Sequence, residues 1–264
     1  MRYTINLYFI YQFLFNKKFR ILSLEKARLR KKTRYREGES TLLTRPLKYV
    51  DANTCYYGYL DIFEKEPYKF VAETENPYII DCGANIGLSV IYFKTLYPGA
   101  SIDAFEPDPG IFKVLTANVR NFGLDKVSLH QSAVWDRSGT VNFNQEGGMS
   151  GRITKPGDSN YASAAATRLK DWLDKPVDFL KIDIEGAEHA VLLDCAEKLG
   201  WVKNLFIEYH SHVSETQKLD EILKILTTSG FRYHLHEAYT VRHPYMEKGD
   251  MLGMDLQLNI YAVR

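Results

Sequence analysis

A glycine-containing turn between an apolar run and a helical pattern is the first place where this chain could bind a ligand. The apolar run ends in Asp81, and the turn has the spacing Asp81-x-Gly83-x-Asn85-x-Gly87. In α/β proteins a strand, a tight turn and a helix N-terminus together form a nucleoside site. The carboxylate of Glu106, at the end of the next apolar run, is suitably spaced to bind ribose hydroxyls.

The spacing of this turn favours a positively charged ligand over a dinucleotide. Dinucleotide sites have the pattern G-x-G-x-x-G, whose second glycine lets the backbone approach the pyrophosphate, and the turn has no glycine there. The carboxylate of Asp81 would repel phosphate and attract an ammonium or sulfonium group. The turn therefore points away from NAD and toward S-adenosylmethionine, although two glycines in a strand-turn-helix segment can also serve packing alone.

A second group of polar residues ends two later apolar runs. Asp183-Ile-Glu185 follows one run, and Glu208-Tyr-His210 ends the other. Side chains at i and i+2 of an extended chain point to the same side, so we expect each pair to face the crevice beside the nucleoside turn. Helix capping alone would also explain Glu185, and we expect Glu188, inside the following helix, to be structural.

These residue types could activate a hydroxyl group toward a methyl donor. A base that accepts the proton as the oxygen attacks contributes about 10²–10⁴ in rate. We expect His210 to be this base, oriented by Glu208 or Asp183, because it is the histidine that shares a strand face with a carboxylate at a strand end. A divalent ion held by the carboxylates is the alternative.

Apolar runs of strand length alternate with helical periodicity from residue 78 onward, which is typical of a doubly wound, mostly parallel α/β sheet. The predicted strands are Tyr78–Cys82, Ser101–Phe105, Val127–Gln131, Val177–Ile182, Asn204–Glu208, Phe231–His236 and Leu256–Val263. The predicted helices are Ile86–Tyr97, Gly110–Phe122, Ala187–Leu199 and Glu215–Ser229.

The last two predicted strands have no helix between them, so we expect an antiparallel pair at one edge of the sheet. Asp255, Gln257 and Asn259 alternate along the final strand and would form one face of a partly exposed edge strand.

The middle of the chain predicts a short hairpin followed by an irregular connection. The hairpin would pair Ser132–Trp135 with Thr140–Asn144 through the turn Asp136-Arg-Ser-Gly139. The connection from Gln145 to Thr167 has no clear periodicity, which is consistent with a lid over the crevice or with a disordered insertion.

The bulk composition suits one large domain with an extension, since the chain has 264 residues. Its net charge is +1, but ten Lys and Arg residues against one Glu lie between Lys17 and Arg36, so the remainder is mildly acidic and carries no basic footprint for nucleic acid. Cys82 and Cys195 lie in apolar patterns, and the three cysteines lack metal-like spacing, which favours a cytoplasmic protein.

The N-terminal segment is aromatic and apolar from Tyr3 to Phe15 and then basic, which reverses the order of a signal peptide. No apolar run reaches the ~18 residues that cross a bilayer. Two interpretations of residues 1–36 are open. They lie on the anionic inner face of a membrane, or they pack on the domain or on a second subunit.

With both groups of polar residues identified, the chain resembles the FkbM family of S-adenosylmethionine-dependent methyltransferases. The resemblance covers about residues 50–264 and leaves residues 1–49 as a basic, aromatic-rich helical extension. The matching segments are Ile79–Gly87, Ala104–Pro107, Asn118, Ser132–Val134, Thr167–Leu173, Phe179–Glu188 and Ile207–His210.

The resemblance implies a Rossmann-like, seven-stranded methyltransferase sheet whose last strand is antiparallel. It implies that residues of the turn surround the methionine part of S-adenosylmethionine: Asp81, Gly83, Ala84, Asn85 and Gly87. Glu106 and Pro107 would bind the ribose, and Ser132 and Ala133 would lie near the adenine. Asp183 would also contact the cofactor. It further implies that the acceptor is faced by Asp183, Glu185, Glu208 and His210.

We therefore expect an O-methyltransferase that acts on a hydroxyl of a sugar, glycan or glycan precursor, as in polysaccharide biosynthesis. The alternatives are a polyketide-like natural product or an amine as the acceptor, and a catalytically silent partner that binds the methyl donor.

Overall fold

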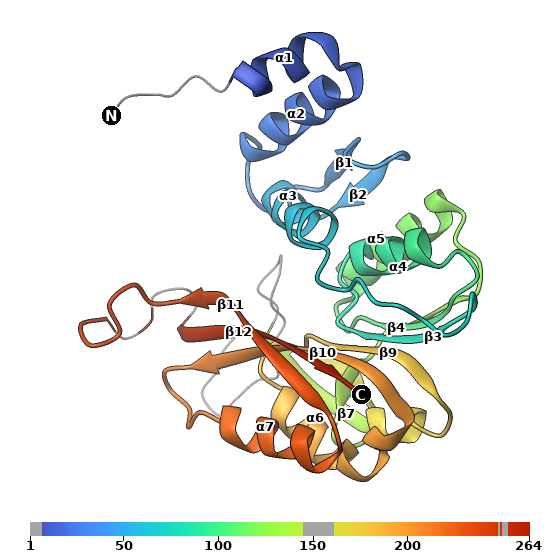
Figure 1. Ribbon diagram of the computed structural model, residues 1–264, viewed down its shortest axis with the longest axis vertical. Coiled ribbons are helices and arrows are strands. Elements are labelled where there is room, and N and C mark those ends of the chain that lie inside the picture. Colours follow the sequence, from blue (N-terminus) through green and yellow to red (C-terminus); the bar gives the residue numbers. More distant parts are fainter. Residues whose placement is uncertain (1–6, 145–160, 248, 250–252) are drawn as a thin grey trace.

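A seven-stranded sheet forms the centre of the computed structural model, which describes residues 7–144, 161–247, 249 and 253–264 (Figure 1). Its strands are β3 (Tyr78–Cys82), β4 (Ser101–Phe105), β5 (Val127–His130), β9 (Val177–Ile182), β10 (Val202–His212), β11 (Arg232–Thr240) and β12 (Met254–Val263). They lie in the order β11-β12-β10-β9-β3-β4-β5. Neighbours from β10 to β5 are parallel, whereas β12 is antiparallel to both of its neighbours. The predicted sheet with its antiparallel last strand is confirmed.

Helices cover both faces of this sheet. Figure 1 shows α4 (Leu88–Leu96) and α5 (Pro109–Phe122) on one side and α6 (Glu188–Cys195) and α7 (Leu219–Thr228) on the other. Ile79 belongs to the core beneath α4 and α5, and its neighbour Ile80 belongs to the core beneath α6 and α7. Both faces of β3 are therefore buried, which explains why the parallel strands read as continuous apolar runs.

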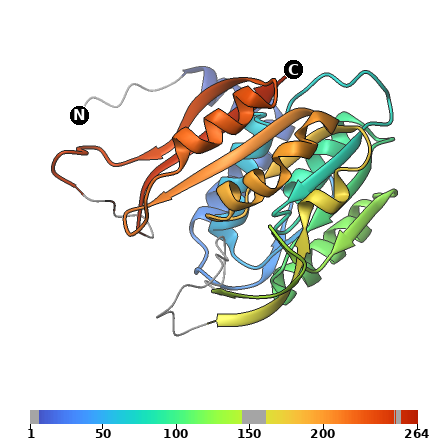
Figure 2. The ribbon, with the colours of Figure 1, turned by 90° about the horizontal axis from the view of Figure 1, so that it is seen from below.

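The last strand lies inside the sheet, because β11 pairs along its outer side and forms the edge. The expected antiparallel pair is confirmed, but the expected edge position of the final strand is wrong. In Figure 2 the long strands β10, β11 and β12, drawn in orange to red, run side by side. Residues of β12 consequently face β10, the strand that carries Glu208 and His210.

A second, three-stranded sheet replaces the predicted hairpin. Its strands are β6 (Ala133–Trp135), β7 (Gly139–Asn144) and β8 (Tyr161–Arg168), in the order β6-β8-β7. Because β8 lies between the other two, the predicted pairing of Ser132–Trp135 with Thr140–Asn144 is wrong. Strand β8 was missed because its run of Ala, Ser and Thr has little apolar alternation. Most of the expected lid, residues 145–160, lies outside the described residues.

The N-terminal extension contains helices α1 (Leu7–Phe15) and α2 (Lys17–Arg30). It also contains a pair of strands that the sequence did not predict, β1 (Gly38–Ser40) and β2 (Leu47–Tyr49). It is followed by α3 (Ala52–Tyr59) and by one π-helical turn, η1 (Leu60–Glu64).

The extension packs on the helices next to the nucleoside turn. Leu29 and Leu47 share a buried cluster with Ile86 and Val114. The side-chain amide of Asn118 on α5 bonds the backbone N–H and C=O of Lys48 at 2.8 and 2.9 Å. No helix in the described part of the chain has the length and hydropathy that a membrane crossing requires.

Candidate active site

The turn after β3 is built around a position that requires glycine. Gly83 has φ +88°, and a Cβ atom there would lie 1.9 Å from the backbone oxygen of Asp183. The N–H groups of Gly83 and Ala84 donate to the carbonyl of Phe105 at 3.1 and 2.9 Å. The turn is therefore joined to the ends of β4 and β9, as the predicted crevice requires.

The carboxylate of Glu106 completes this side of the site. It is buried, and its two oxygens accept the N–H groups of Asn85 at 3.0 Å and Asp108 at 2.9 Å. Burial raises the pKa of Glu106 to about 7, and these two bonds limit the rise. Asn85 has a left-handed φ of +47°, a conformation that asparagine tolerates better than most residues. Two loops that are distant in sequence are thus held together by one side chain.

The electrostatic role expected of Asp81 needs correction. Its side chain is fully buried, accepts a hydrogen bond from the Ser89 hydroxyl, and lies 3.3 Å from the Lys181 ammonium. A buried carboxylate beside a lysine is already compensated, so its charge does not reach a ligand directly. Asp81 instead holds the turn and the lysine in place.

Lys181 is the central residue that sequence reasoning missed. Its Nζ atom lies 3.1 Å from the Asp183 carboxylate as well as near Asp81, and it donates to the Gly83 carbonyl at 2.8 Å. Burial alone would lower the pKa of Lys181, but Asp183 and Asp81 outweigh it and the pKa lies well above its usual value. The sequence did contain a sign of this role, since Lys181 lies inside an apolar strand. A lysine that is buried in this way needs carboxylate partners.

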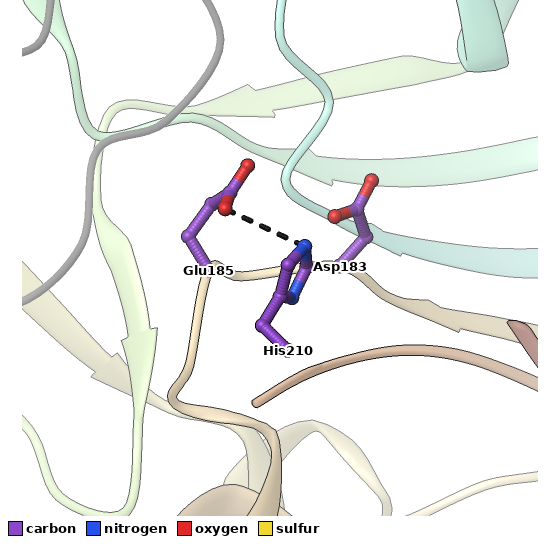
Figure 3. A group of neighbouring side chains, drawn as sticks. All are labelled: Asp183, Glu185 and His210. Carbon is purple, nitrogen blue, oxygen red and sulfur yellow. Dashed lines mark ion pairs between the residues drawn. The ribbon is translucent and has the colours of Figure 1, made fainter. Parts of the chain in front are cut away.

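Two carboxylates and one imidazole meet at the ends of β9 and β10 (Figure 3). One ligand atom each from Asp183, Glu185 and His210 lies within 4.8 Å of the others. The Nε2 atom of His210 is 3.4 Å from the Glu185 carboxylate. The sequence-predicted acidic pair and the histidine are therefore brought together, with Glu185 in a left-handed conformation at φ +57°.

Glu188, which we expected to be structural, orients the histidine ring. Its Oε1 atom accepts a hydrogen bond from His210 Nδ1 at 2.9 Å and another from the N–H of Gly186 at 3.0 Å. The expectation that Glu208 or Asp183 would orient the ring is thus wrong. Burial alone would lower the pKa of His210, but Glu185 and Glu188 outweigh it and raise the pKa well above its usual value.

Gln257 on β12 joins Glu208 to His210. Its amide nitrogen contacts the Glu208 carboxylate and lies 3.3 Å from His210 Nε2. Gln257 stands opposite His210 in the antiparallel register, so Gln257 belongs to the site, although the sequence indicated only a place on one face of an edge strand. Burial, and then the negative charge of Asp183, raise the pKa of Glu208 to about 8.

A cavity connects the two groups of predicted residues. It is lined by the turn, by the β9 and β10 carboxylates and by the segment before β3, including Gly83, Ala84, Asn85, Lys181, Asp183, Glu185, Glu208, Gln257, Thr54, Asp61 and Tyr68. His210 borders a second, smaller cavity together with Glu188 and Gly186. The acceptor side therefore has Glu208 at its surface and the imidazole behind it.

The remaining predicted residues are not among those that line this cavity. Gly87, with φ +91°, immediately precedes α4, and a Cβ atom there would lie 2.7 Å from a Leu115 methyl carbon. Pro107 follows Glu106 in the loop after β4. Ser132 and Ala133 are buried where the chain passes from β5 to β6, and the Ser132 hydroxyl bonds Thr167 at 2.8 Å.

Known proteins resemble this chain over the part that carries the site. The family profile described as "Methyltransferase FkbM domain" matches residues 81–233, which is more than half of the sequence. Methyltransferase sdnD of Sordaria araneosa is 32% identical over 189 residues, 57% of this chain and 73% of sdnD. The 2-O-methyltransferase NoeI of Sinorhizobium fredii (strain NBRC 101917 / NGR234) is 30% identical over 160 residues, 52% of this chain and 65% of NoeI, just under two thirds of it.

A solved structure supports the fold. M. jannaschii TYW2 in complex with AdoMet superimposes with a TM-score of 0.50 at 12% identity, over 88% of this chain and 86% of TYW2. At this identity the similarity concerns the fold, a Rossmann-like methyltransferase sheet, and not the acceptor.

Proposed function

The chain belongs to the FkbM methyltransferase family, as its sequence resemblance predicted, and we propose that it transfers a methyl group from S-adenosylmethionine to a hydroxyl of a sugar, glycan or glycan precursor. The observation that carries this proposal is the shared cavity. The Gly83–Asn85 turn and the carboxylate of Glu208 line the same space. A methyl donor at the turn and a hydroxyl at Glu208 would therefore be neighbours, which supplies the proximity that transfer needs.

The residues of the turn fit S-adenosylmethionine. Each Glu106 oxygen accepts one N–H group and retains a lone pair that a ribose hydroxyl can use. The carboxylates that line the cavity favour a cation, which the sulfonium group is. When bound, S-adenosylmethionine supplies an electrophilic methyl group. The turn and Glu106 would hold it, and the walls of the cavity would orient the acceptor.

Glu208 is the residue that we assign to accept the proton of the attacking hydroxyl. It lines the cavity, whereas His210 lies behind it. Glu185 and Glu188 raise the pKa of His210 well above its usual value, so this buried ring is less suited than Glu208 to receive and release the proton. A pKa of about 8 makes the ionised Glu208 a stronger base than an ordinary carboxylate. His210, through Gln257, would hold Glu208 in position.

A polyhydroxylated acceptor suits the lining of the cavity. The side chains of Asp61, Asp183 and Glu185 accept hydrogen bonds, and the Gln257 amide also donates them. The name of NoeI, a 2-O-methyltransferase, supports hydroxyl chemistry in a relative. Carboxylates also attract ammonium groups, so an amine acceptor is the competitor that an experiment must include.

The test is methyl transfer from radiolabelled S-adenosylmethionine to a matched panel: nucleotide sugars and oligosaccharides, hydroxylated polyketide-like compounds, and amines of similar size. We expect product with the carbohydrate acceptors, a loss of product in Glu208→Gln, and no loss in Glu221→Gln, whose carboxylate lies outside the cavity. Methylation of amines alone would contradict the proposal. Binding of the methyl donor without any product would favour the silent-partner alternative.

A reducing, cytoplasmic location is part of the proposal. Cys55, Cys82 and Cys195 are free and buried, which supports a protein that functions without disulfides. The basic and aromatic N-terminal helices would then face either the inner surface of the membrane or another subunit.

A further inference from the structure

We propose that Asp183, Glu185 and His210 form a binding site for one divalent cation of the Mn²⁺ or Mg²⁺ type. The cation-binding part of this inference stands on the geometry of the three side chains alone. Its catalytic part, in which the ion holds the acceptor hydroxyl, rests on the proposed function.

The distances suit a shared ion. The three ligand atoms lie within 4.8 Å of one another, and His210 Nε2 is 3.4 Å from the nearer Glu185 oxygen. Adjacent ligands of an octahedral ion with bonds of ~2.1 Å lie about 3 Å apart, so a small closing movement would bring these atoms into one coordination sphere. Figure 3 shows the imidazole between the two carboxylates.

The histidine ring is oriented for this role by a residue behind it. Glu188 accepts the Nδ1–H bond at 2.9 Å, which leaves Nε2 directed at Glu185. A carboxylate behind a histidine, holding one ring nitrogen so that the other faces the ion, is the usual outer arrangement of metal-binding histidines. Both Glu188 and His210 are buried, so the ring cannot easily turn away.

The charge of the region also calls for a cation. The carboxylates of Asp183, Glu185 and Glu188 gather around the ends of two strands, and the Lys181 ammonium is shared between Asp183 and Asp81. Removing several negative charges from water is costly unless positive charge accompanies them. A divalent ion would supply it.

The donor set favours an oxygen-preferring ion, since two of the three ligands are carboxylates. Asp183 and Glu185 line the main cavity, so the open coordination positions would face the acceptor. There the ion would hold the acceptor oxygen and make its proton more acidic. In the transfer the sulfur–methyl bond breaks, the oxygen–methyl bond forms, and the hydroxyl proton passes to Glu208.

The experiment is titration of the full-length protein with Mn²⁺ alone, followed by the electron paramagnetic resonance signal of free Mn²⁺, with neither methyl donor nor acceptor present. We expect one Mn²⁺ per chain. Asp183→Asn, Glu185→Gln and His210→Gln should each weaken binding at least tenfold, and Glu188→Gln should weaken it about 10–100-fold through the ring orientation.

Glu221→Gln is the matched control. Glu221 also pairs with a histidine, His189, at 2.8 Å, but it lies outside the cluster, so binding should be unchanged. Absence of Mn²⁺ binding in the folded wild-type protein at millimolar metal would overturn the proposal and leave an internal ion pair between His210 and Glu185. Binding that survives the Asp183, Glu185 and His210 variants, with their fold verified by circular dichroism, would overturn it equally.

This readout separates the two proposals. A protein that methylates hydroxyls at full rate in EDTA and binds no Mn²⁺ would retain the proposed function without the ion. A protein that binds Mn²⁺ at these residues but methylates no hydroxyl would retain the cation site and lose the proposed function.

Discussion

The two sides of the site differ in how their charges are compensated. On the donor side, which comprises the Asp81–Gly87 turn and Glu106, each carboxylate already has partners from the chain: Ser89 and Lys181 for Asp81, and two backbone N–H groups for Glu106. On the acceptor side, which comprises Asp183, Glu185, Glu208 and His210, the carboxylates face one another around the imidazole, and Asp183 shares its Lys181 partner with Asp81. The donor side is therefore preorganised, whereas the acceptor side holds negative charge that a ligand can use.

Lys181 connects the two sides. Its ammonium reaches Asp81 on the donor side and Asp183 on the acceptor side, and its strand neighbours β3 in a register that sets Asp81 beside Lys181. A substitution there should therefore affect both ends, whereas changes at Glu106 or Glu208 should affect one end each.

The largest effect should come from Glu208→Gln. If the acceptor side supplies the base, kcat should fall by about 10²–10⁴. The dissociation constant of S-adenosylmethionine, measured by calorimetry, should stay within about twofold because the donor side is intact. Equal losses in kcat and in affinity for the methyl donor would break the division into two sides.

Lys181→Met should lower the free energy of unfolding by about 3–5 kcal/mol, because Asp81 and Asp183 would lose their buried partner. Urea denaturation measures this loss. Lys203→Met is the control: Lys203 also contacts two carboxylates, Glu73 and Asp178, but its side chain is 37% exposed. We expect its loss to be at most about 1 kcal/mol. Similar losses for the two variants would show that the buried contacts of Lys181 stabilise the fold no more than the partly exposed contacts of Lys203.

The rate of methyl transfer should rise with pH until about pH 8. Because the pKa of Glu208 is raised to about 8, the proton-accepting form is scarce at pH 6 and grows roughly tenfold per pH unit below the pKa. A pH–rate profile at saturating substrates would show a rising limb that levels above pH 8. Glu208→Gln should remove this limb, and its survival in the variant would assign the base elsewhere.

Glu106→Gln should weaken binding of S-adenosylmethionine by about tenfold, since a hydrogen bond to a charged group contributes roughly 1.5–3 kcal/mol. The wild-type affinity should also fall below about pH 7, where Glu106 takes up a proton. Calorimetric titration would measure both effects, with the exposed Asp125→Asn as the control. A variant with unchanged affinity would remove Glu106 from the donor side.

The smallest effect on the cavity should come from deleting residues 1–16, because none of the described residues in this segment lines it. Tyr11, Leu14 and Phe15 on α1 are more than half exposed and precede the basic helix α2, so deletion should reduce flotation with anionic vesicles and leave donor affinity within about twofold. Neutral vesicles serve as the control. Unchanged flotation would favour packing on a second subunit.

The sequence predicted the sheet well, for a local reason. Three strands, β3, β4 and β9, were predicted with the bounds that the structure has, because each is an apolar run bounded by turn residues. The run Ala-Ser-Ala-Ala-Ala-Thr of β8 carries no such signal, since its strand conformation depends on pairing with both β6 and β7. The predicted hairpin is wrong for the same reason, because β6 and β7 each pair with β8, which lies much further along the chain, and not with each other.

The sequence predicted the site residues that lie in motifs, but not the residues that contact them. Asp81, Glu106, Asp183 and Glu208 were identified because each ends an apolar run, and a charge at that place is conspicuous in a sequence. Lys181, Glu188 and Gln257 were missed as site residues. Each acts through a contact with another strand or helix, and no spacing within its own segment indicates that contact.

The sequence by itself determined the strands of the main sheet and the helices that alternate with them, the glycine turn, the family and the residues that stand at the strand ends. Tertiary structure decided which of these charges are compensated. The β3–β9 register sets Lys181 beside Asp81, and the β10–β12 register sets Gln257 beside His210. Compensation depends on distances between side chains that are far apart in the chain, and those distances exist only after the strands have paired.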